Sequence, residues 1–436
     1  MIDTELLKEK VLDLAMRGEL VDENSQEWHE FIFGDLVTIR RGGSPRPIRS
    51  YLTRDIEGIN WIKISDTIPG EKYITQTQEK IIKEGLNKSR AVSVGDFLLS
   101  NSMSYGRPYI LKIDGAIHDG WLAISKYENF FDKDFLFYLL SSPYVKKQFE
   151  LLATGSTVKN LNIERVSSIK VLLPPLNLQK DTVLKIEEIF NRIDQLEEEQ
   201  EKINHFKHLI QAKVLQLAMQ GKLVPQLPEE GTAANLLEEV EVERQRLIDE
   251  KKIKKDKPLP EISEDEIPYD IPESWEWVRL GDILIEHVGG GTPSKKVPEY
   301  WGGDIPWCSI KDFHGDILTK TIDAITEEGL NNSSSNLIKR GNLIVATRLA
   351  VGKIMLTDID VAINQDLRAL IFGTGVNKAY IRYIYGQLNF VTQGVTVKGI
   401  NINNLLSILI PLPPLKEQER IAKKLDEINQ VLHGEH

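Results

Sequence analysis

Apolar residues recur at helical spacing in the middle of the chain. Between Ile186 and Leu217 they follow a heptad pattern, in which two seam positions alternate three and four residues apart. One seam position holds Ile186, Ile193, Gln200, Lys207 and Val214, and the other holds Ile189, Leu196, Ile203, Ile210 and Leu217. Eight of these ten residues are apolar. The pattern therefore predicts one long helix within residues 174–224.

Two shorter apolar stripes lie at the ends of the chain, within residues 1–22 and 413–436. They consist of Leu7, Val11 and Leu14 near the N-terminus, and of Ile421, Leu425, Ile428 and Leu432 near the C-terminus. Both stripes match the central helix, so an antiparallel coiled coil is expected. The helices could bury this seam and nothing else, or could also dock a partner. Since Gln200 and Lys207 interrupt the seam, we expect a gap opposite residues 197–207.

Short apolar runs between turn residues predict strands on either side of the central helix. The expected strands are Ile59–Ile64, Asp96–Ser100, Tyr109–Ile113, Ile169–Leu173, Leu343–Thr347, Lys353–Leu356 and Ser407–Leu412. A helix is expected after residue 132 and another after residue 376. The fold class is therefore α+β, with strands and helices mixed in each globular part.

The chain contains an internal duplication with an offset of about 245 residues. The matched segments include Gly34–Leu36 with Gly281–Ile283, Ile59–Trp61 with Ile305–Trp307, Glu84–Ser89 with Glu328–Ser333, Ala116–Ile117 with Ala362–Ile363, and Leu173–Leu176 with Leu412–Leu415. Two copies of one domain are therefore expected, at residues 23–173 and 273–412.

A second repeat has a different offset. Lys10–Met16 returns as Lys213–Met219, whereas the residues after Pro414 match the start of the central helix. One helical repeat is thus split between the two ends of the chain. This circular order predicts pseudo-twofold symmetry, with the termini near each other.

Residues 225–272 have the composition of a linker, with several prolines, a charged helix near Leu236–Ile253 and a lysine run at 251–257. We expect this segment to tether the second domain. The lysines could touch DNA or could form an ordinary solvated run of charge.

Composition narrows the class of protein. The 436 residues are 41% hydrophobic, which is enough for two globular cores. No apolar stretch is long enough for a membrane span, and the N-terminus is charged throughout, so a soluble, cytoplasmic protein is expected. Cys308 is the only cysteine, which excludes an internal disulfide.

The net charge of −11 argues against nucleic acid until its distribution is considered. The sum is −6 over residues 1–30, +5 over 31–170, −8 over 171–270 and −1 over 271–410. The acidic residues therefore belong mainly to the helical segments. The first domain is basic and the second is near neutral.

No catalytic motif emerges from the sequence. There is no phosphate-binding loop, no HExxH pair and no defensible Ser/His/Asp set. Leu173–Leu176 resembles the Asn/Asp-Pro-Pro-aromatic motif of amino-methyltransferases only superficially, because it lacks both the polar first residue and the aromatic last one. We expect no catalytic residues, no metal site and no cofactor on this chain.

Polar and basic residues instead gather on three loops in each copy. In the first copy they are Arg41, Ser44, Arg46, Arg49 and Tyr51, then Asn101, Ser102, Tyr105 and Arg107, then Thr157, Lys159, Asn160 and Asn162. In the second copy they are Thr292, Ser294, Lys295 and Lys296, then Thr347 and Arg348, then Thr396, Lys398, Asn401 and Asn403. Arg and Asn can read base edges, and Lys, Ser and Thr can bind phosphates. These residues form the candidate DNA-binding sites, although each one taken alone could belong to an ordinary surface loop.

With these features together, the chain resembles the specificity subunits of Type I restriction-modification systems. The resemblance rests on two recognition domains alternating with helices, on the Leu-Pro-Pro-Leu start of each helix followed by Gln179 or Gln418, and on the circular repeat. It implies that each domain reads half of a bipartite double-stranded DNA site, that the helices set the spacing, and that two modification subunits and the restriction subunits join the chain. It also implies that S-adenosylmethionine binds the modification subunit.

Two other functions stay open from the residues alone. One is a coiled-coil assembly scaffold without a DNA role. The other is an enzyme with cryptic methyltransferase or nuclease activity.

Overall fold

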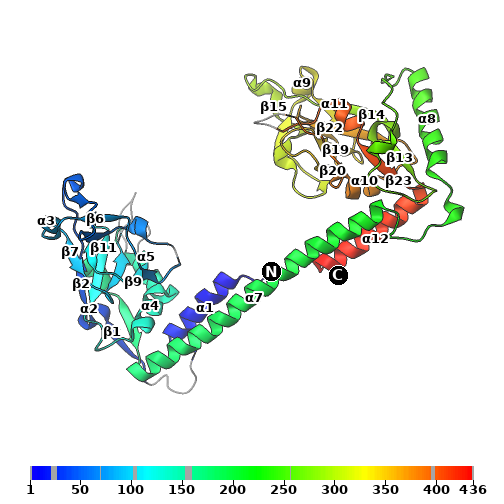
Figure 1. Cartoon of the computed structure of the whole chain (residues 1–436). Helices are drawn as coiled ribbons and strands as arrows, with labels where there is room; N and C mark the ends of the chain where they lie inside the picture. Colours follow the sequence, from blue (N-terminus) through cyan, green and yellow to red (C-terminus); the bar gives the residue numbers. More distant parts are fainter. Residues whose placement is uncertain are drawn as a thin grey trace. The chain divides into compact units, whose positions relative to one another are not determined.

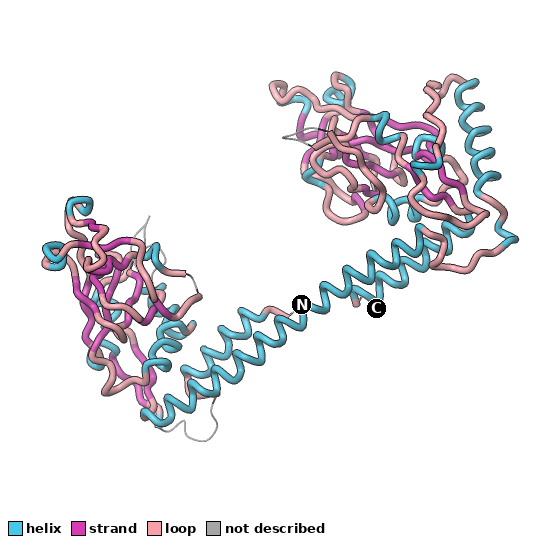
Figure 2. Tube along the Cα trace, viewed as in Figure 1, coloured by secondary structure: helices cyan, strands magenta, loops and turns pink. Residues whose placement is uncertain are grey.

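The computed structural model describes residues 2–20, 27–68, 70–101, 106–152, 160–255, 257–393 and 398–434 (Figure 1). The chain divides into two compact units, Met1–Ile203 and Asn204–His436. Each unit combines strands with helices, as Figure 2 shows by colour. The units are described separately below.

The first unit is built on two sheets of five strands each, in the orders β2-β11-β8-β9-β5 and β3-β6-β4-β10-β7. Its strands are β1 (His29–Ile32), β2 (Thr38–Arg41), β3 (Leu52–Thr53), β4 (Ile59–Ile62), β5 (Tyr73–Ile74), β6 (Glu79–Ile81), β7 (Arg90–Val92), β8 (Phe97–Ser100), β9 (Pro108–Leu111), β10 (Gly115–Ile117), β11 (Trp121–Ser125) and β12 (Lys170–Leu173). Its helices are α1 (Thr4–Met16), α2 (Phe33–Leu36), α3 (Lys83–Leu86), α4 (Lys133–Ser141), α5 (Pro143–Leu152), α6 (Ile163–Ser167) and the first part of α7 (Leu176–Met219).

The second unit has sheets in the orders β14-β22-β19-β20-β16 and β17-β15-β21-β18. Its strands are β13 (Glu276–Arg279), β14 (Leu284–Gly289), β15 (Trp301–Cys308), β16 (Ile317–Leu318), β17 (Asp323–Ile325), β18 (Asn336–Ile338), β19 (Leu343–Ala346), β20 (Ile354–Thr357), β21 (Val361–Ile363), β22 (Leu367–Phe372) and β23 (Leu409–Leu412). Its helices are α8 (Ala233–Asp249), α9 (Glu327–Asn331), α10 (Lys378–Tyr385), α11 (Ile402–Leu406), α12 (Leu415–His433) and the end of α7.

The strand orders of the two units correspond strand by strand. β2-β11-β8-β9-β5 matches β14-β22-β19-β20-β16, and β6-β4-β10-β7 matches β17-β15-β21-β18. Even the parallel pairing of β10 with β4 recurs as β21 with β15. The predicted duplication and the α+β fold class are therefore confirmed.

Strands β8 and β19, each in the middle of a five-stranded sheet, are covered by apolar side chains on both faces, which explains why their sequences are apolar runs. Along β8, Phe97 and Leu99 belong to the core that includes the helices, whereas Leu98 belongs to the core shared with the second sheet. Leu343 and Ile344 of β19 divide in the same way. Successive side chains of a strand point to opposite faces, so two covered faces require an unbroken apolar run. The expected strands are present, with ends that differ by at most two residues, and the helices expected after residues 132 and 376 are α4 and α10.

Helix α1 runs antiparallel to the first part of α7. Lys8 Nζ lies 2.8 Å from Asp194 Oδ1, and the Ile2 amide donates to Gln200 Oε1 at 2.7 Å. The expected stripe was wrong at Leu14, which is 41% exposed, whereas Leu12, Ala15 and Met16 are buried. The reason is that α1 also packs against α4 and α5, so the globular part helps to decide which face is covered.

Helix α12 is likewise antiparallel to the end of α7. Gln211 Nε2 donates to Asn429 Oδ1 at 3.1 Å, and Gln226, beyond the end of α7, donates to Glu417 near the start of α12 at 2.5 Å. Ile421 and Leu425 are buried in the core of the second unit, as the heptad pattern predicts.

The seam of α7 is not covered along its whole length. Exposed fractions are 54% and 47% for the seam residues Ile203 and Ile210, and 59% and 51% for Phe206 and Leu209, which lie outside the seam positions. Gln200, by contrast, hydrogen-bonds the backbone of Ile2. The uncovered stretch therefore begins after Gln200. The expected gap, opposite residues 197–207, was placed a few residues too early at its start.

The segment at 225–272 is more than a tether. Helix α8 buries Ala233, Leu236 and Val240 in the main core of the second unit, and Arg244 donates to the carbonyl oxygen of Asp282. The apolar spacing within this charged helix was the signal for that packing. No helix in the described ranges is both long enough and apolar enough to cross a membrane.

Candidate nucleic-acid interface

In each unit, a glycine-rich loop lies against the turn that follows one strand, β10 in the first unit and β21 in the second. The Gly42 amide donates to the Trp121 carbonyl oxygen at 3.0 Å, and the Gly43 amide to that of Ile117 at 3.2 Å. In the second unit the Gly291 amide donates to the Ile363 carbonyl oxygen at 2.9 Å. Two segments distant in sequence are thus joined in the same way twice.

Glycine is required in this loop because of the close approach. A Cβ atom at Gly42 would lie 2.0 Å from the carbonyl oxygen of His118, and one at Gly290 would lie 2.2 Å from that of Ile363. No side chain fits at such distances without backbone movement. The repeated glycines are therefore explained by packing, and the residues after them are held in place.

A third segment completes each cluster. The Asn101 amide donates to the Gly120 carbonyl oxygen at 3.0 Å, and the Thr347 amide to that of Asp366 at 2.8 Å. The Leu161 amide in turn donates to the Asn101 carbonyl at 2.9 Å, and the Ile400 amide to that of Thr347 at 2.9 Å. We call these three-segment assemblies the first and second loop clusters, each centred on its turn, residues 118–120 or 364–366.

In the first loop cluster, charged side chains surround Asp119. Ser44 Oγ donates to Asp119 Oδ1 at 2.7 Å, Arg41 Nε donates to the Asp119 carbonyl oxygen at 3.2 Å, and Arg46 lies 3.9 Å from the carboxylate. The hydrogen bond from Ser44 lowers the pKa of Asp119, and nearby Arg41 adds to this. Asp119 is therefore ionised at neutral pH, with its side chain 48% exposed.

His118 lies beside this carboxylate but faces inward. Its Nε2 and Nδ1 atoms lie 3.2 Å from the Ile64 amide and 2.6 Å from the Gly120 amide. A neutral imidazole can accept from only one of them, and an imidazolium from neither. Burial lowers the pKa of His118, so the ring is neutral at pH 7.

The first loop cluster encloses a cavity of about 360 Å³. Lys63, Asn101 and Asn160 line it together with Arg41 and the turn. Asn101 is buried, its Nδ2 donates to the Asp119 carbonyl oxygen at 2.9 Å, and its Oδ1 has no hydrogen-bond partner among the residues that the structure describes.

The second loop cluster encloses a cavity of about 580 Å³. Thr292 donates to Gln365 Oε1, as Ser44 does to Asp119. Lys295, Lys311 and Asn364 also line this cavity. Arg348 lies 3.8 Å from Asp366 and is 62% exposed.

The structure brings together only part of the candidate residues. Arg41, Ser44, Arg46, Asn101 and Asn160 meet at the first turn, and Thr292, Lys295, Thr347 and Arg348 at the second. Ser102, Tyr105, Thr157, Lys159 and Thr396 lie outside the described residues.

Other candidates have structural contacts instead. Asn162 and Asn401 cap α6 and α11 by accepting backbone N–H groups at 2.9 and 2.8 Å. Tyr51 packs in a small core and accepts from Lys88 Nζ at 2.7 Å. Arg107 lines a different cavity, beside α1.

The remaining candidates are exposed residues. Arg49 is exposed in a short 3-10 helix, Ile48–Ser50. Ser294 Oγ accepts from the Lys296 amide at 3.4 Å, and the Lys398 carbonyl oxygen accepts from the Leu349 amide at 3.1 Å. Asn403 is exposed on α11.

The two turns themselves were missed by sequence reasoning. Their signal was present, because the matched pair Ala116–Ile117 and Ala362–Ile363 is followed at once by different residues, His118–Gly120 and Asn364–Asp366. A position where two copies diverge directly after a matched strand is a candidate for different specificity.

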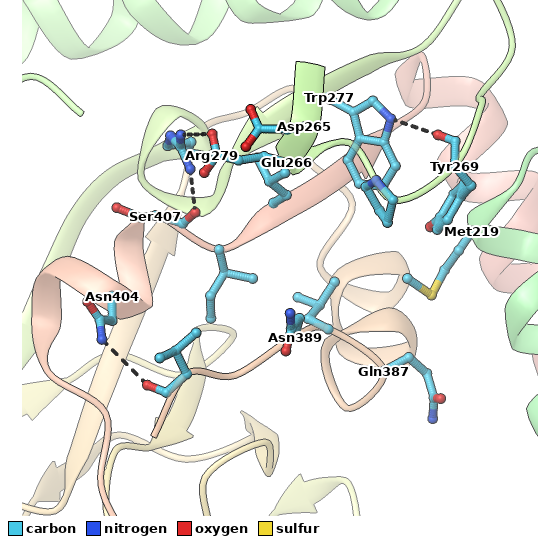
Figure 3. A pocket seen from close by; sticks show the side chains of 15 residues that line it. Met219, Asp265, Glu266, Tyr269, Trp277, Arg279, Gln387, Asn389, Asn404 and Ser407 are labelled. Atoms are coloured by element: carbon cyan, nitrogen blue, oxygen red, sulfur yellow. Dashed lines mark hydrogen bonds and ion pairs between the residues drawn. The ribbon is translucent and has the colours of Figure 1, made fainter. Parts of the chain in front are cut away.

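A further cavity of about 550 Å³ lies elsewhere in the second unit, lined by Tyr269, Trp277 and residues of the segment after α10, among them Gln387 and Asn389 (Figure 3). Its arginine, Arg279, is buried and donates to the carbonyl oxygens of Pro260 and Ser407 at 2.6 and 2.9 Å and to Glu266 at 2.7 Å. The guanidinium is therefore held by hydrogen bonds within the protein and serves the packing of this unit.

Cys308 is also buried, and burial raises the pKa of its thiol, which does not suit a nucleophile.

The comparisons with known proteins agree with this architecture. A family model described as the type I restriction modification DNA specificity domain matches residues 25–205 and 272–434. The EcoAI specificity subunit of Escherichia coli is 30% identical over 236 residues, which cover 50% of this chain and 39% of that protein. The EcoR124I/EcoR124II specificity subunit of Escherichia coli is 33% identical over 170 residues, which cover 36% of this chain and 42% of that protein. These alignments span about two fifths of the length of those relatives.

Other matches extend over nearly the whole chain. The putative MjaX specificity subunit of Methanocaldococcus jannaschii is 24% identical over 94% of this chain and 89% of that protein. The HsdS subunit structure from Thermoanaerobacter tengcongensis matches with a TM-score of 0.55 and 18% identity over 94% of this chain and 90% of that one. A chain from a structure titled for complex assembly of the type I R-M system matches with a TM-score of 0.59 and 19% identity, covering 94% and 91%. These structures share the fold. With one matched region around each loop cluster, the chain belongs to the type I restriction modification DNA specificity domain family.

Proposed function

We propose that this chain is the DNA sequence-specificity subunit of a type I restriction-modification complex, and that each loop cluster reads one half of a bipartite site in double-stranded DNA. The observation that carries this proposal is the repeated backbone framework with different side chains. Ser44, Asp119 and Asn101 stand where Thr292, Gln365 and Thr347 stand in the second unit. One scaffold with two sets of side chains is suited to reading two different sequences.

The charges of both loop clusters support a nucleic-acid ligand. Arg41, Arg46 and Lys63 lie at the first turn, and Lys295, Lys311 and Arg348 at the second. Cationic side chains on loops can neutralise phosphates and position the duplex, while amide and carboxylate groups face the base edges. The acidity of the chain does not oppose this, because it is concentrated in the helices and in 171–270.

The proposal assigns no chemical step to this chain. Two modification subunits, bound along the helices, would carry S-adenosylmethionine and methylate adenine, and restriction subunits would complete the complex. Exposed Phe206, Leu209 and Ile210 on α7 supply apolar surface for such a partner. Within the described ranges, no three or more His, Cys, Asp or Glu side chains are placed to hold a metal ion.

The direct test is competition binding by the reconstituted complex of this chain with its modification subunit. A mixture of duplexes with random sequence should yield one bipartite motif, bound at least about 1,000-fold more tightly than unrelated DNA. Equal, weak binding to every sequence would instead favour an assembly scaffold.

An enzymatic role is tested with the chain alone. The purified chain should neither methylate nor cleave DNA when S-adenosylmethionine and Mg²⁺ are present. Turnover without partners would contradict the proposal and favour a cryptic methyltransferase or nuclease.

A further inference from the structure

Asp119 and Gln365 occupy equivalent positions in the two loop clusters. Each is the second residue after the matched strand end, Ile117 or Ile363. Each accepts a hydrogen bond from the hydroxyl group that follows the paired glycines, Ser44 or Thr292. The backbone around both residues is held by the same amide-to-carbonyl contacts, so only the side chain differs in kind.

That difference changes what the position can offer to a ligand, because only Gln365 can also donate a hydrogen bond. The Asp119 carboxylate accepts hydrogen bonds and cannot donate. The amide of Gln365 can accept and donate, and within the described residues its Nε2 group has only a long contact of 3.4 Å, to Asp366. Both side chains reach solvent, since Asp119 is 48% exposed and Gln365 is exposed.

A carboxylate is an unexpected group on a surface that faces phosphates. It repels the DNA backbone, and part of the favourable charge of Arg41 and Arg46 is lost to it. An exposed ion pair at 3.9 Å contributes little to folding stability, so structure alone does not account for the carboxylate. A base amino group is the DNA feature that a carboxylate recognises favourably.

Resting on the proposed function, we propose that Asp119 and Gln365 are the specificity-determining residues of the two half-sites. Asp119 accepts a hydrogen bond from the exocyclic amino group of a cytosine or adenine. Gln365 forms the paired hydrogen bonds that an amide makes with adenine, donating to N7 and accepting from the amino group. Ser44 and Thr292 are positioning residues that hold these side chains at the turn.

The test uses the reconstituted complex and a library of duplexes randomised in both half-sites. Asp119→Asn keeps the size of the side chain but adds a donor, and Gln365→Glu removes one. At one position of the first half-site, Asp119→Asn should lower the preference for the favoured base pair over the reversed pair, in which the amino group lies on the other strand, by about tenfold or more. It should leave the second half-site unchanged. Gln365→Glu should lower the preference for adenine at one position of the second half-site and leave the first half-site unchanged.

Matched controls separate readout from charge and folding. Glu84→Gln in exposed α3 makes the same charge change in the first unit and should leave both preferences unchanged. Asp119→Glu should retain the amino-base preference with weaker binding. Thermal unfolding of each variant confirms that the unit is folded.

Two results would overturn the proposal. One is a uniform loss of affinity with unchanged preference at every position, which would make Asp119 only an organiser of Arg41 and Arg46. The other is unchanged binding when the preferred adenine or cytosine at the affected position is replaced by an analogue that lacks the exocyclic amino group. Failure of the proposed function would look different, because the unsubstituted complex itself would then show no sequence preference.

Discussion

At the scale of residues, the first loop cluster presents Arg46 almost entirely to solvent. Its side chain is 85% exposed, and its nearest anion, Asp119, is 3.9 Å away. Such a pair holds the guanidinium only loosely, because exposed ion pairs are worth about 0–1 kcal/mol. Arg46 is therefore available to bind DNA.

Replacing Arg46 by alanine should weaken binding by about 1–3 kcal/mol if the guanidinium contacts a base, and should relax specificity in the first half-site only. Titration of matched and singly altered duplexes measures both effects. Arg192→Ala, on exposed helix α7, is the control and should change neither. Equal weakening on all sequences would show a phosphate contact instead.

Gly290 tests whether the glycine pair is needed for packing. Gly290→Ala places a Cβ atom 2.2 Å from the Ile363 carbonyl oxygen, and should lower the free energy of unfolding by about 1–3 kcal/mol. Gly386→Ala is the control, since a Cβ atom there has its nearest contact at 3.7 Å. Denaturant unfolding compares the two, and similar stabilities would contradict the packing argument.

At the scale of elements, the Leu-Pro-Pro-Leu motif and its glutamine connect a strand, a long helix and a short helix. Gln179 Nε2 donates to the carbonyl oxygens of Phe130 and Pro174 at 2.8 and 2.9 Å, and its Oε1 accepts from Asp132, the N-cap of α4, at 2.7 Å. Gln418 makes the same bond to Asn377, the N-cap of α10, at 2.8 Å. The glutamine thus joins the start of α7 to the start of α4, and the start of α12 to the start of α10.

Gln418→Leu should therefore destabilise the second unit by about 1–3 kcal/mol, because the partly buried Asn377 amide and the buried Pro413 carbonyl lose their partner. Gln430→Leu on the exposed side of the same helix is the control. Thermal unfolding measures the difference. Equal melting temperatures for the two variants would refute this role.

Helix α7 should differ in stability along its length. Amide hydrogens between Ile203 and Ile210 should exchange at least about tenfold faster than those of residues 183–193, because their apolar side chains are exposed in this chain. Hydrogen exchange with mass spectrometry measures this. Uniformly slow exchange would contradict it, and added modification subunit should slow the fast stretch.

The helices and strands could be predicted from the sequence wherever the burial of their own side chains determined the residue pattern. Strand β19 is apolar throughout, and β8 is apolar up to Ser100, because both faces of these strands are covered, and their sequences show it directly. The face of α1 was misassigned at Leu14 because its burial depends on α4 and α5, which are distant in sequence.

The site was predictable only in part, for a related reason. The loops with Arg41 and Thr292 were recognised by their composition, but Asp119 and Gln365 belong to short turns without periodicity. Their importance depends on contacts with hydroxyl groups about 75 residues away in sequence. Cap residues such as Asn162 look the same in sequence as base-reading asparagines.

At the scale of the whole molecule, the chain is one domain used twice, with helices that begin after each copy. Each unit has its own core and its own loop cluster. The expected pseudo-twofold relation and the proximity of the termini stay predictions. The composition nevertheless suggests separate roles for the helices and the loops. Acidic helices suit protein partners, and basic loops suit DNA.

The most direct measurement maps adenine methylation across genomic DNA in cells that carry the complete system, with and without this chain. The account predicts a single bipartite motif, two short specific blocks separated by a spacer of fixed length, that disappears when the chain is deleted. Methylation that persists without the chain, or a motif of one uninterrupted block, would contradict two half-sites read by two loop clusters.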